Sequence, residues 1–390
     1  MSKEQRPFSV GVPTEIKQGE RRVGLTPTSV KAIVDKGSTV FIQRGAGEGS
    51  GFTDKAYSQA GARIVSSADE AWNEDIVVKV KEPLGSEVER IRSGAMAEKI
   101  LVTYLHLAGD QAKTLTEALM EGGATGIAYE TISTYDSNGR SRTPCLEPMS
   151  AIAGALAVQK GAQMLESTNN GMGKSLGKIY GIENDPAEVV IIGGGFVGSS
   201  AAHTALGLEA NVTILEANET RRNEILRDPQ LQGARVLPST TETLAENLQK
   251  ADVAVGGIYI KGQRADRIVT ADMLRNMKPK AVFVDVAIDQ GGMTELSTPT
   301  SHEHPVIHLE NEAELYCVTN MPALLPRDAS NALSKTTKRY IVALASKGLD
   351  ALNDDPALAR GLNVYKGKIV DEKVAQAHGF PHHPNLFLPK

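Results

Sequence analysis

The chain alternates short apolar, β-branched runs with longer segments of helical periodicity along almost its whole length. Strand-like runs in the first part are FSVGVP, STVFIQRG, DIVVKV, KILVTYLHL and ATGIAYET. Helix-like segments such as TSVKAIVDKG and DQAKTLTEALMEGG separate them, and a glycine pair ends the second of these. Such alternation produces right-handed β–α–β crossovers, whose strands pair in parallel. The pattern therefore predicts an α/β fold with mostly parallel sheets.

A second series of strand-like runs begins near residue 187 and comprises AEVVIIGGG, NVTILEAN, DVAVGGI, KAVFVDVAI and LYCVTN. A small-residue-rich amphipathic helix is expected between the two series, at residues 151–165. After Asn320 the pattern turns helical, with Asp328 and Ser330 as expected capping residues. This tail, read as free of strands, is expected to pack back on the first domain.

At 390 residues the chain exceeds one comfortable core, so two domains are expected. We predict two Rossmann-like α/β domains with mostly parallel sheets, the second inserted in a discontinuous first domain. The first domain is expected to comprise residues 1–143 and 328–390, and the second residues 144–327.

Charge and composition exclude several kinds of partner. The net charge of −5 and the pI of about 6.0 argue against a nucleic-acid or anionic-membrane partner, since either would need a basic face. No apolar window has membrane-spanning length, and the N-terminus has no apolar core of signal-peptide length. Two cysteines, Cys145 and Cys317, suggest a reduced compartment, so a cytoplasmic protein is expected.

A glycine-rich turn predicts a dinucleotide site. The stretch IIGGGFVGSSAA fits G-x-G-x-x-G at Gly193, Gly195 and Gly198, follows a strand-like run and opens a helix. Gly193 would permit the tight turn, Gly195 would let the backbone approach a pyrophosphate, and Gly198 would allow close helix–strand packing. The next strand ends in Glu216, placed to bind the ribose hydroxyls and to repel a 2′-phosphate. NAD is therefore favoured over NADP, a preference that Arg221 and Arg222 soften.

Ionisable residues gather where other strands are expected to end. The run LVTYLHLAGD places His106 near the end of a strand, and VFVDVAIDQGG places Asp289 there too. Lys81 follows DIVVKV, and Arg22 follows the first strand. In open α/β sheets, ligands bind outside the carboxyl ends of the strands. Cations that clamp a carboxylate and an imidazole that shuttles protons are what an amino-acid oxidoreductase needs.

Several motifs in order along nearly the whole chain resemble L-alanine dehydrogenase. They are RVGLTP around Arg22, VKVKEP around Lys81, TYLHLA around His106, GIAYET, PMS around Ser150, VIIGGGFVG, VDVAIDQGG and NMPA. That family shares ancestry with the NAD(H)-binding component of proton-translocating transhydrogenase. The resemblance implies reversible, NAD-dependent conversion of L-alanine to pyruvate and ammonium, in homo-oligomers that are usually hexamers and sometimes smaller. It also implies that residues 144–327 form a cofactor domain inserted in a discontinuous substrate domain of residues 1–143 and 328–390.

The resemblance also implies roles for individual residues. Substrate-binding residues are then Arg22, Lys81, Asn320 and Met321, and the acid/base candidates are His106 and Asp289. Besides the glycines and Glu216, the cofactor is expected to contact Ser150 and Ser239. No metal is expected, because the histidines of SHEHPVIH and HGFPHHP fit no closed zinc pattern and read as structural.

Some positions depart from the family pattern and leave alternatives open. Ala151 stands where the family has a glutamate, Lys261 where proline is expected, and Glu314 where histidine is common. The stretch GMGKSLGKIYGIEND replaces a glycine- and proline-rich segment, and NMPALL lacks a glycine. A dehydrogenase for another small L-amino acid is therefore an alternative. A transhydrogenase-like NAD(H) component and a catalytically silent NAD-binding protein are the others, although the first lacks the lysine–histidine pair present here.

Overall fold

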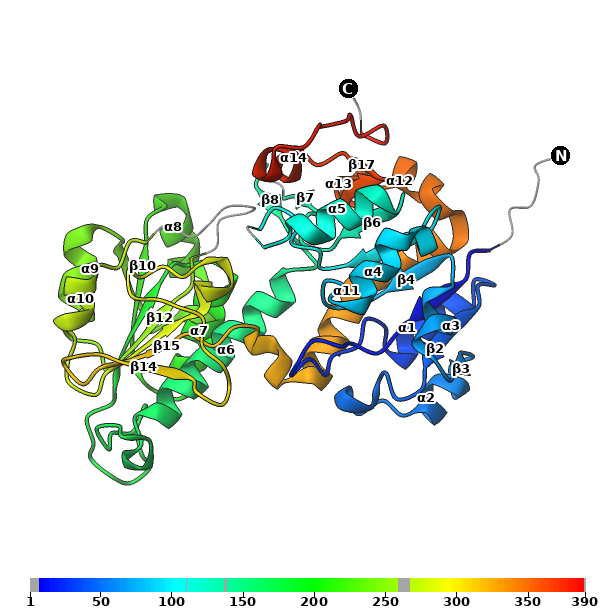
Figure 1. The fold of residues 1–390 in the computed structure, drawn as a ribbon. Coiled ribbons are helices and arrows are strands. Elements are labelled where there is room, and N and C mark those ends of the chain that lie inside the picture. The colour runs from blue at the N-terminus through cyan, green and yellow to red at the C-terminus, as the bar shows by residue number, and fades with distance from the viewer. Residues whose placement is uncertain (1–6, 110, 137–138, 259–266, 389–390) are drawn as a thin grey trace. The chain divides into compact units, whose positions relative to one another are not determined.

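The computed structural model describes residues 7–109, 111–136, 139–258 and 267–388. The chain forms two compact units (Figure 1). Unit 1 comprises residues 1–149 and 323–390, and unit 2 comprises residues 150–322. Two α/β domains, one inserted in the other, are thus confirmed. Lys261, which stands where the family pattern has proline, lies outside the described residues.

Unit 1 is built on one sheet, in which eight strands from the described part of the chain follow the order β17-β16-β6-β5-β4-β1-β2-β3. Strands β1 to β6 are parallel, and β16 joins β6 antiparallel. The order from β3 to β6 is that of a doubly wound sheet, with its switch point between β1 and β4. The strands are β1 (Val10–Val12), β2 (Val40–Gln43), β3 (Arg63–Val65), β4 (Ile76–Val78), β5 (Ile100–Thr103), β6 (Thr125–Ala128), β16 (Leu362–Tyr365) and β17 (Lys368–Ile369).

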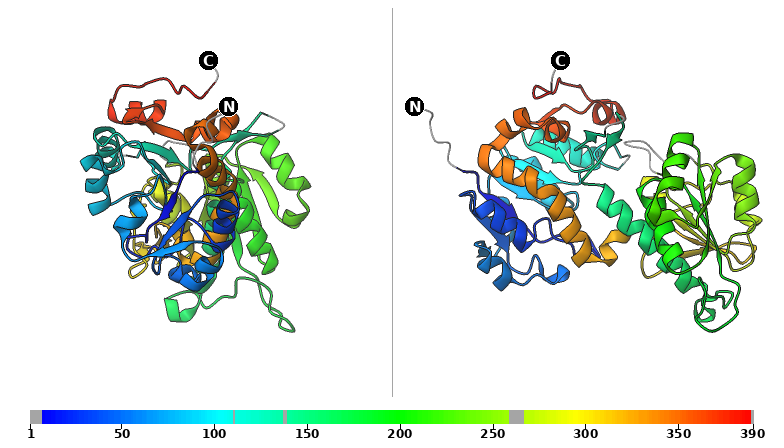
Figure 2. Two further views of the ribbon diagram at one scale, coloured as in Figure 1. Left: turned by 90° about the vertical axis from the view of Figure 1, so that its right-hand side faces the viewer. Right: turned by 180° about the vertical axis from the view of Figure 1, so that it is seen from behind.

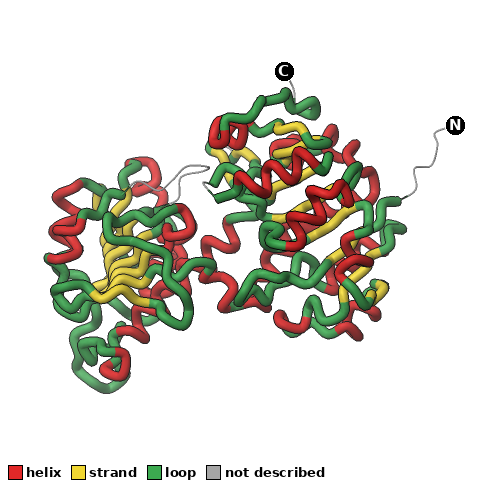
Figure 3. Tube along the Cα trace, viewed as in Figure 1, coloured by secondary structure: helices red, strands yellow, loops and turns green. Residues whose placement is uncertain are grey.

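Helices cover both faces of this sheet (Figure 3). One apolar cluster joins strand residues such as Val77 and Leu101 to Trp72, Ile91, Leu119 and the C-terminal Val374. The helices of unit 1 are α1 (Pro27–Val34), α2 (Asp54–Gln59), α3 (Ala68–Trp72), α4 (Ser86–Arg90), α5 (Lys113–Glu121), α11 (Pro326–Lys347), α12 (Ala351–Asp354), α13 (Pro356–Arg360) and α14 (Glu372–His378). A small hairpin pairs β7 (Thr134–Tyr135) with β8 (Ser141–Arg142).

The long helix α11 joins the two halves of unit 1 through hydroxyl groups. Ser334 Oγ accepts a hydrogen bond from the Thr26 amide at 3.0 Å and donates one to Ser29 Oγ at 2.7 Å. Ser330 Oγ accepts one from the Val23 amide at 3.0 Å. All of these side chains are buried. The segment that carries Arg22 is therefore fixed against α11.

Unit 2 contains a second doubly wound sheet, with the order β11-β10-β9-β12-β13-β15-β14 in the described part of the chain. Its switch point lies between β9 and β12. All pairings are parallel except that of β14 with β15. The strands are β9 (Glu188–Ile192), β10 (Asn211–Glu216), β11 (Arg235–Pro238), β12 (Val253–Gly256), β13 (Val282–Asp285), β14 (Val306–His308) and β15 (Glu314–Tyr316).

Helices lie on both sides of the unit 2 sheet in two views (Figures 1 and 2). Helices α9 and α10 share an apolar cluster with Ile192, Ala254 and Phe283. Gly161 of α6 lies so close to Val253 that an added Cβ would come within 2.5 Å of its side chain. The helices are α6 (Glu147–Met164), which begins in unit 1, α7 (Phe196–Gly207), α8 (Glu219–Arg227), α9 (Thr241–Leu248) and α10 (Ala271–Arg275).

Three local expectations were wrong. The C-terminal tail contains strands β16 and β17, although it packs on unit 1 as expected. Helix α11 begins at Pro326 without a side-chain cap, because Asp328 lies inside its first turn and Ser330 is bonded to Val23. Strand β5 ends at Thr103, three residues before His106. Across the described residues, no helix has the length and apolar character needed to cross a bilayer.

Candidate active site

Ionisable residues follow the carboxyl ends of the central strands of unit 1. Glu15 and Arg22 follow β1, Lys81 follows β4, His106 follows β5 and Glu130 follows β6. Because these four strands are neighbours and parallel, their ends share one edge of the sheet. The three predicted residues Arg22, Lys81 and His106 thus lie along the same edge of the sheet, the one formed by the carboxyl ends of its strands.

Arg22 is a buried cation with a dedicated partner. Its Nε and Nη2 donate to the two oxygens of Glu20 at 2.8 and 2.6 Å, and its Nη1 contacts Met149 Sδ at 3.2 Å. Burial works against the charged guanidinium, but the Glu20 carboxylate outweighs it and raises the pKa of Arg22. The guanidinium is therefore charged and fixed in orientation, while its neighbour Arg21 is exposed.

A second buried network holds the segment that carries Lys81. Glu15 accepts hydrogen bonds from the amides of Val80 at 2.6 Å and Lys81 at 3.3 Å. The same carboxylate pairs with the fully buried Lys79 at 3.0 Å, and Glu87 pairs with that ammonium at 2.9 Å. Burial disfavours the charge on Lys79, yet the two carboxylates raise its pKa. Lys79 is therefore structural, and Lys81 is the lysine placed at the edge.

His106 lies in a tight turn just beyond β5. Its backbone is left-handed, with φ of 49°, and its carbonyl accepts a hydrogen bond from Gly109 at 2.9 Å. Glu130 accepts from the amides of Leu105 at 3.2 Å and His106 at 2.5 Å. The imidazole stacks on the ring of Tyr104, with 5.8 Å between centroids and 8° between planes. The ring is thus presented from an ordered turn.

The glycine turn of unit 2 has the geometry of a dinucleotide site. Gly193 has φ of 95°, a left-handed value that glycine favours. A Cβ on Gly198 would come within 1.8 Å of the Gly193 carbonyl, so the helix and the turn pack too closely for any side chain. A Cβ on Gly195 would meet no atom within 4 Å, so its surroundings are open to a ligand. The turn ends at α7, whose N-terminal amides favour an anion.

Glu216 ends β10 beside this turn. Its carboxylate accepts from the amides of Gly194 at 2.7 Å and Asn218 at 2.8 Å. Arg221 donates to the Gly194 carbonyl at 2.7 Å, which brings a positive charge to the turn. Ser239, just beyond β11, donates its amide to the Glu216 carbonyl at 3.2 Å. The residues of unit 2 therefore fit a nucleotide whose ribose meets a carboxylate.

Two further predicted residues of unit 2 lie together. Asp289 is in the 3₁₀ helix η5 (Val286–Gln290), and its Oδ1 accepts from the Asn320 amide at 3.1 Å. Asn320, like His106, has a left-handed backbone, with φ of 57°. The buried Asp285 holds the loop that carries Asp289, accepting from Ala287, Met293 and Ser297. Met321 is buried, and Ser150 is partly buried in α6.

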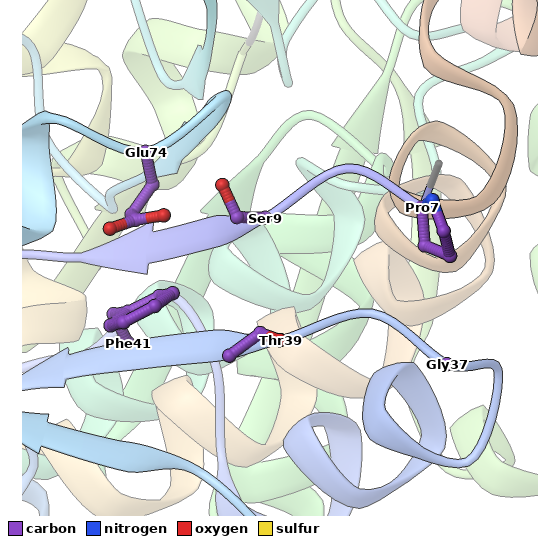
Figure 4. A pocket seen from close by; sticks show the side chains of 6 residues that line it. All are labelled: Pro7, Ser9, Gly37, Thr39, Phe41 and Glu74. Carbon is purple, nitrogen blue, oxygen red and sulfur yellow. The ribbon is translucent and has the colours of Figure 1, made fainter. Parts of the chain in front are cut away.

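Several supporting residues belong to no motif that predicts a role for them. Glu20, Glu15 and Glu130 orient the predicted residues, and Tyr104 stacks on His106. Sequence offers one signal for them, namely their position next to the strand ends. The pocket in Figure 4 lies elsewhere, at the amino ends of β1 and β2, where Ser9 and Thr39 precede the strands.

The histidines of the two histidine-rich stretches have separate partners, among them the Leu107 carbonyl for His378 and the Val370 carbonyl for His382. His308 pairs with the buried Glu314 at 3.3 Å across the β14–β15 ladder. Among the residues that the structure describes, no group of three or more histidine, cysteine or acidic side chains could hold a metal ion.

Comparison with known proteins decides the family. Models of the N-terminal and C-terminal domains of alanine dehydrogenase/PNT match residues 11–153 and 157–372. The chain belongs to the alanine dehydrogenase/PNT family. It is 42% identical to the alanine dehydrogenase of Halomonas elongata over 378 residues, which are 96% of this chain and 98% of that protein.

Solved structures agree with this family assignment. An L-alanine dehydrogenase superposes with a TM-score of 0.87 at 43% identity, covering 95% of this chain and 99% of that one. The transhydrogenase from Sinorhizobium meliloti gives 0.77 at 23% identity, covering 93% and 99%, which shows a shared fold. Family membership accounts for the Rossmann-like unit 2, since alanine dehydrogenases use NAD.

Proposed function

We propose that this protein catalyses the NAD-dependent, reversible oxidative deamination of L-alanine to pyruvate and ammonium. The observation that carries this proposal is the set Arg22, Lys81 and His106 on one sheet edge, in a chain of the alanine dehydrogenase/PNT family. A substrate with a carboxylate and an exchangeable amino group suits two cations and an imidazole.

Arg22 and Lys81 bind the carboxylate of alanine or pyruvate in this proposal. Glu20 holds the Arg22 guanidinium in one orientation, and Glu15 holds the backbone before Lys81. Fixed cations restrict the substrate to one pose, which makes the reaction effectively unimolecular. Asn320 and Met321, which belong to unit 2, are also proposed as substrate-binding residues.

His106 moves the protons in this proposal. Deamination requires water to add to an iminium carbon and ammonia to leave, so a base and an acid are needed at adjacent atoms. An imidazole serves both roles near neutral pH. Asp289 is the second acid/base candidate, and its bond to the Asn320 amide fixes its carboxylate.

Unit 2 holds the cofactor in this proposal. Gly193, Gly195 and Gly198 form the turn for the pyrophosphate, Glu216 binds the ribose, and Ser150 and Ser239 make further contacts. Bound NAD supplies the acceptor for the hydride from the alanine Cα. A carboxylate at the ribose position disfavours the 2′-phosphate of NADP.

A homo-oligomer in the cytoplasm is also proposed. Support for association comes from a turn with unusually exposed apolar side chains, in which Ile179 bridges to Ile182 and Tyr180 is fully exposed. Size-exclusion chromatography with light scattering measures the number of chains, for which a hexamer or a smaller assembly is expected.

The test of the reaction is NADH formation at alkaline pH with a panel of L-amino acids and NAD. We expect clear preference for alanine, and reductive amination of pyruvate in the reverse direction. Preference for another small L-amino acid would transfer the proposal to that substrate. No activity with any member of the panel would contradict it.

A variant tests the assignment of His106. His106→Ala should lower kcat by about 10²–10⁴-fold, the usual contribution of general acid–base catalysis. NAD affinity should be unchanged, because the cofactor residues lie in unit 2. His304→Ala, which removes an exposed histidine from a loop of unit 2, is the control and should keep wild-type turnover. Near-wild-type kcat in His106→Ala would exclude the proposed role.

A further inference from the structure

The turn that carries His106 receives a contact from the far end of the chain. His378 is the last residue of α14, and its Nε2 lies 2.6 Å from the carbonyl oxygen of Leu107. A carbonyl only accepts hydrogen bonds, so the imidazole carries its proton on Nε2 and donates it. The bonded carbonyl belongs to the residue immediately after His106.

This turn needs anchoring, because its conformation is intrinsically unfavourable. His106 is a non-glycine residue at φ of 49°, a backbone region that persists only where the surroundings enforce it. On one side, Glu130 accepts from the amides of Leu105 and His106. On the other side, the structure shows the His378 bond to Leu107. The two contacts hold opposite ends of the strained peptide.

Apolar packing holds His378 next to the Leu107 carbonyl. Leu105 and Leu107 belong to the same buried apolar cluster as Val374 and Ala375 of α14, with Phe380 against it. The rings of His378 and Phe380 are 5.9 Å apart. Helix α14 is therefore docked on the segment that precedes and follows His106, and its final side chain reaches the carbonyl as a result.

We propose that His378 is a positioning residue, which fixes the turn that presents the His106 imidazole. It contacts neither substrate nor cofactor in this proposal and acts through the Leu107 carbonyl. The inference rests on the proposed function in assigning proton transfer to His106. The turn geometry itself is independent of that assignment.

The test compares three variants with the wild-type protein. His378→Phe keeps the ring volume and removes the donor, whereas His378→Gln keeps an N–H at a similar reach. His382→Phe is the matched control, because His382 Nε2 also meets a backbone carbonyl, that of Val370 at 3.3 Å, away from the turn.

We expect kcat and kcat/KM to fall together by roughly 3- to 10-fold in His378→Phe, the effect of losing one hydrogen bond. KM for pyruvate should change by less than about twofold, since Arg22 and Lys81 are unaffected. His378→Gln should recover most of the loss, and His382→Phe should show none. Wild-type kcat in His378→Phe, or an equal loss in His382→Phe, would overturn the proposal.

Hydrogen exchange provides a readout that does not depend on activity. Amides in residues 101–109 should exchange faster in His378→Phe than in wild type or His382→Phe, because the turn loses one anchor. Unchanged exchange in this segment would refute the positioning role. An inactive wild-type protein would contradict the proposed function and leave this comparison intact.

Discussion

Two residues that are proposed to act in catalysis or substrate binding share an unusual, left-handed backbone conformation. His106 and Asn320 both have positive φ without being glycine, at 49° and 57°. Strain of this kind concentrates at functional sites, where neighbouring contacts enforce it. Glu130 anchors His106, and Asp289 accepts from the Asn320 amide. Each of these amides is thus bonded to a carboxylate in a segment that follows a strand, Glu130 after β6 and Asp289 in the 3₁₀ helix after β13.

Glu216 is expected to set the choice between NAD and NADP. Glu216→Ala removes a charge that repels a 2′-phosphate, while Arg221 and Arg222 remain nearby. The NAD:NADP ratio of kcat/KM should fall by about 10- to 100-fold, the range expected for removing a like-charge contact. The ratio cancels any general loss of stability.

The control for this variant is Glu219→Ala, which removes an exposed carboxylate from the first turn of α8. Its cofactor ratio should equal that of the wild type. An unchanged ratio in Glu216→Ala would show that the ribose contact has been assigned to the wrong residue.

The sequence located the residues that are proposed to react better than it located the residues that hold them in place. Arg22, Lys81 and His106 follow strand ends, so the topology alone indicates one edge. The bidentate Arg22–Glu20 pair and the Glu130 bonds depend on loop conformation, which no periodicity specifies. The roles of the predicted residues stay predictions until variants are measured.

At the scale of elements, apolar periodicity located most strands and helices, because parallel strands covered on both faces are continuous apolar runs. It misplaced the end of β5, since Tyr104 and Leu105 are as buried as the strand itself. It also missed β16 and β17, which are short. Strand β16 pairs antiparallel with the sequence-distant β6, and β17 pairs antiparallel with β16 at the edge of the sheet. Burial marks a core, and only pairing defines a strand.

The amino end of β12 is held by a buried carboxylate. Asp252 accepts from Lys174 at 2.8 Å, Lys278 at 2.7 Å and the Glu188 amide at 2.9 Å. Burial raises the pKa of Asp252, but these donors outweigh it and lower the pKa below its ordinary value of 3.8. Asp252 therefore stabilises unit 2 above that value, and the contribution is lost as pH falls through the lower pKa of the folded state.

Asp252→Asn should consequently lower the free energy of unfolding by about 1–2 kcal/mol at pH 7, since the two lysines are partly exposed. The deficit should be the same at pH 5 and shrink below about pH 4. Urea unfolding at these pH values measures it. Asp272→Asn removes an exposed i,i+3 partner of Arg275 and should have almost no effect. A deficit that is constant down to pH 3 would contradict the charge-based explanation.

At the scale of the whole molecule, the stability of unit 1 depends on contacts between distant parts of the chain. We call the hydrogen bonds of Ser330 and Ser334 in α11 with residues 23–29 the seam. Ser334→Ala would leave the buried Thr26 amide without its acceptor and the Ser29 hydroxyl without its donor. We expect it to cost about 1–3 kcal/mol of the free energy of unfolding, the penalty for an unsatisfied buried polar group.

Ser346→Ala on the same helix is the matched control, because that hydroxyl bonds to the Val342 carbonyl of its own helix. It should change stability by less than about 0.5 kcal/mol. Equal losses in the two variants, measured by urea unfolding, would show that the seam adds nothing beyond helix propensity.

Because unit 1 is discontinuous, its sheet cannot be completed until the end of the chain has been synthesised. Thr131 donates to the carbonyl of Gly361, which lies 230 residues later in the chain. A ribosome adds about 5–20 residues per second, so β6 waits roughly 10–50 s for its β16 neighbour. The inserted unit is complete within that interval. A nascent chain therefore carries a finished nucleotide-binding unit and an open sheet edge, which makes that edge the expected contact for chaperones during synthesis.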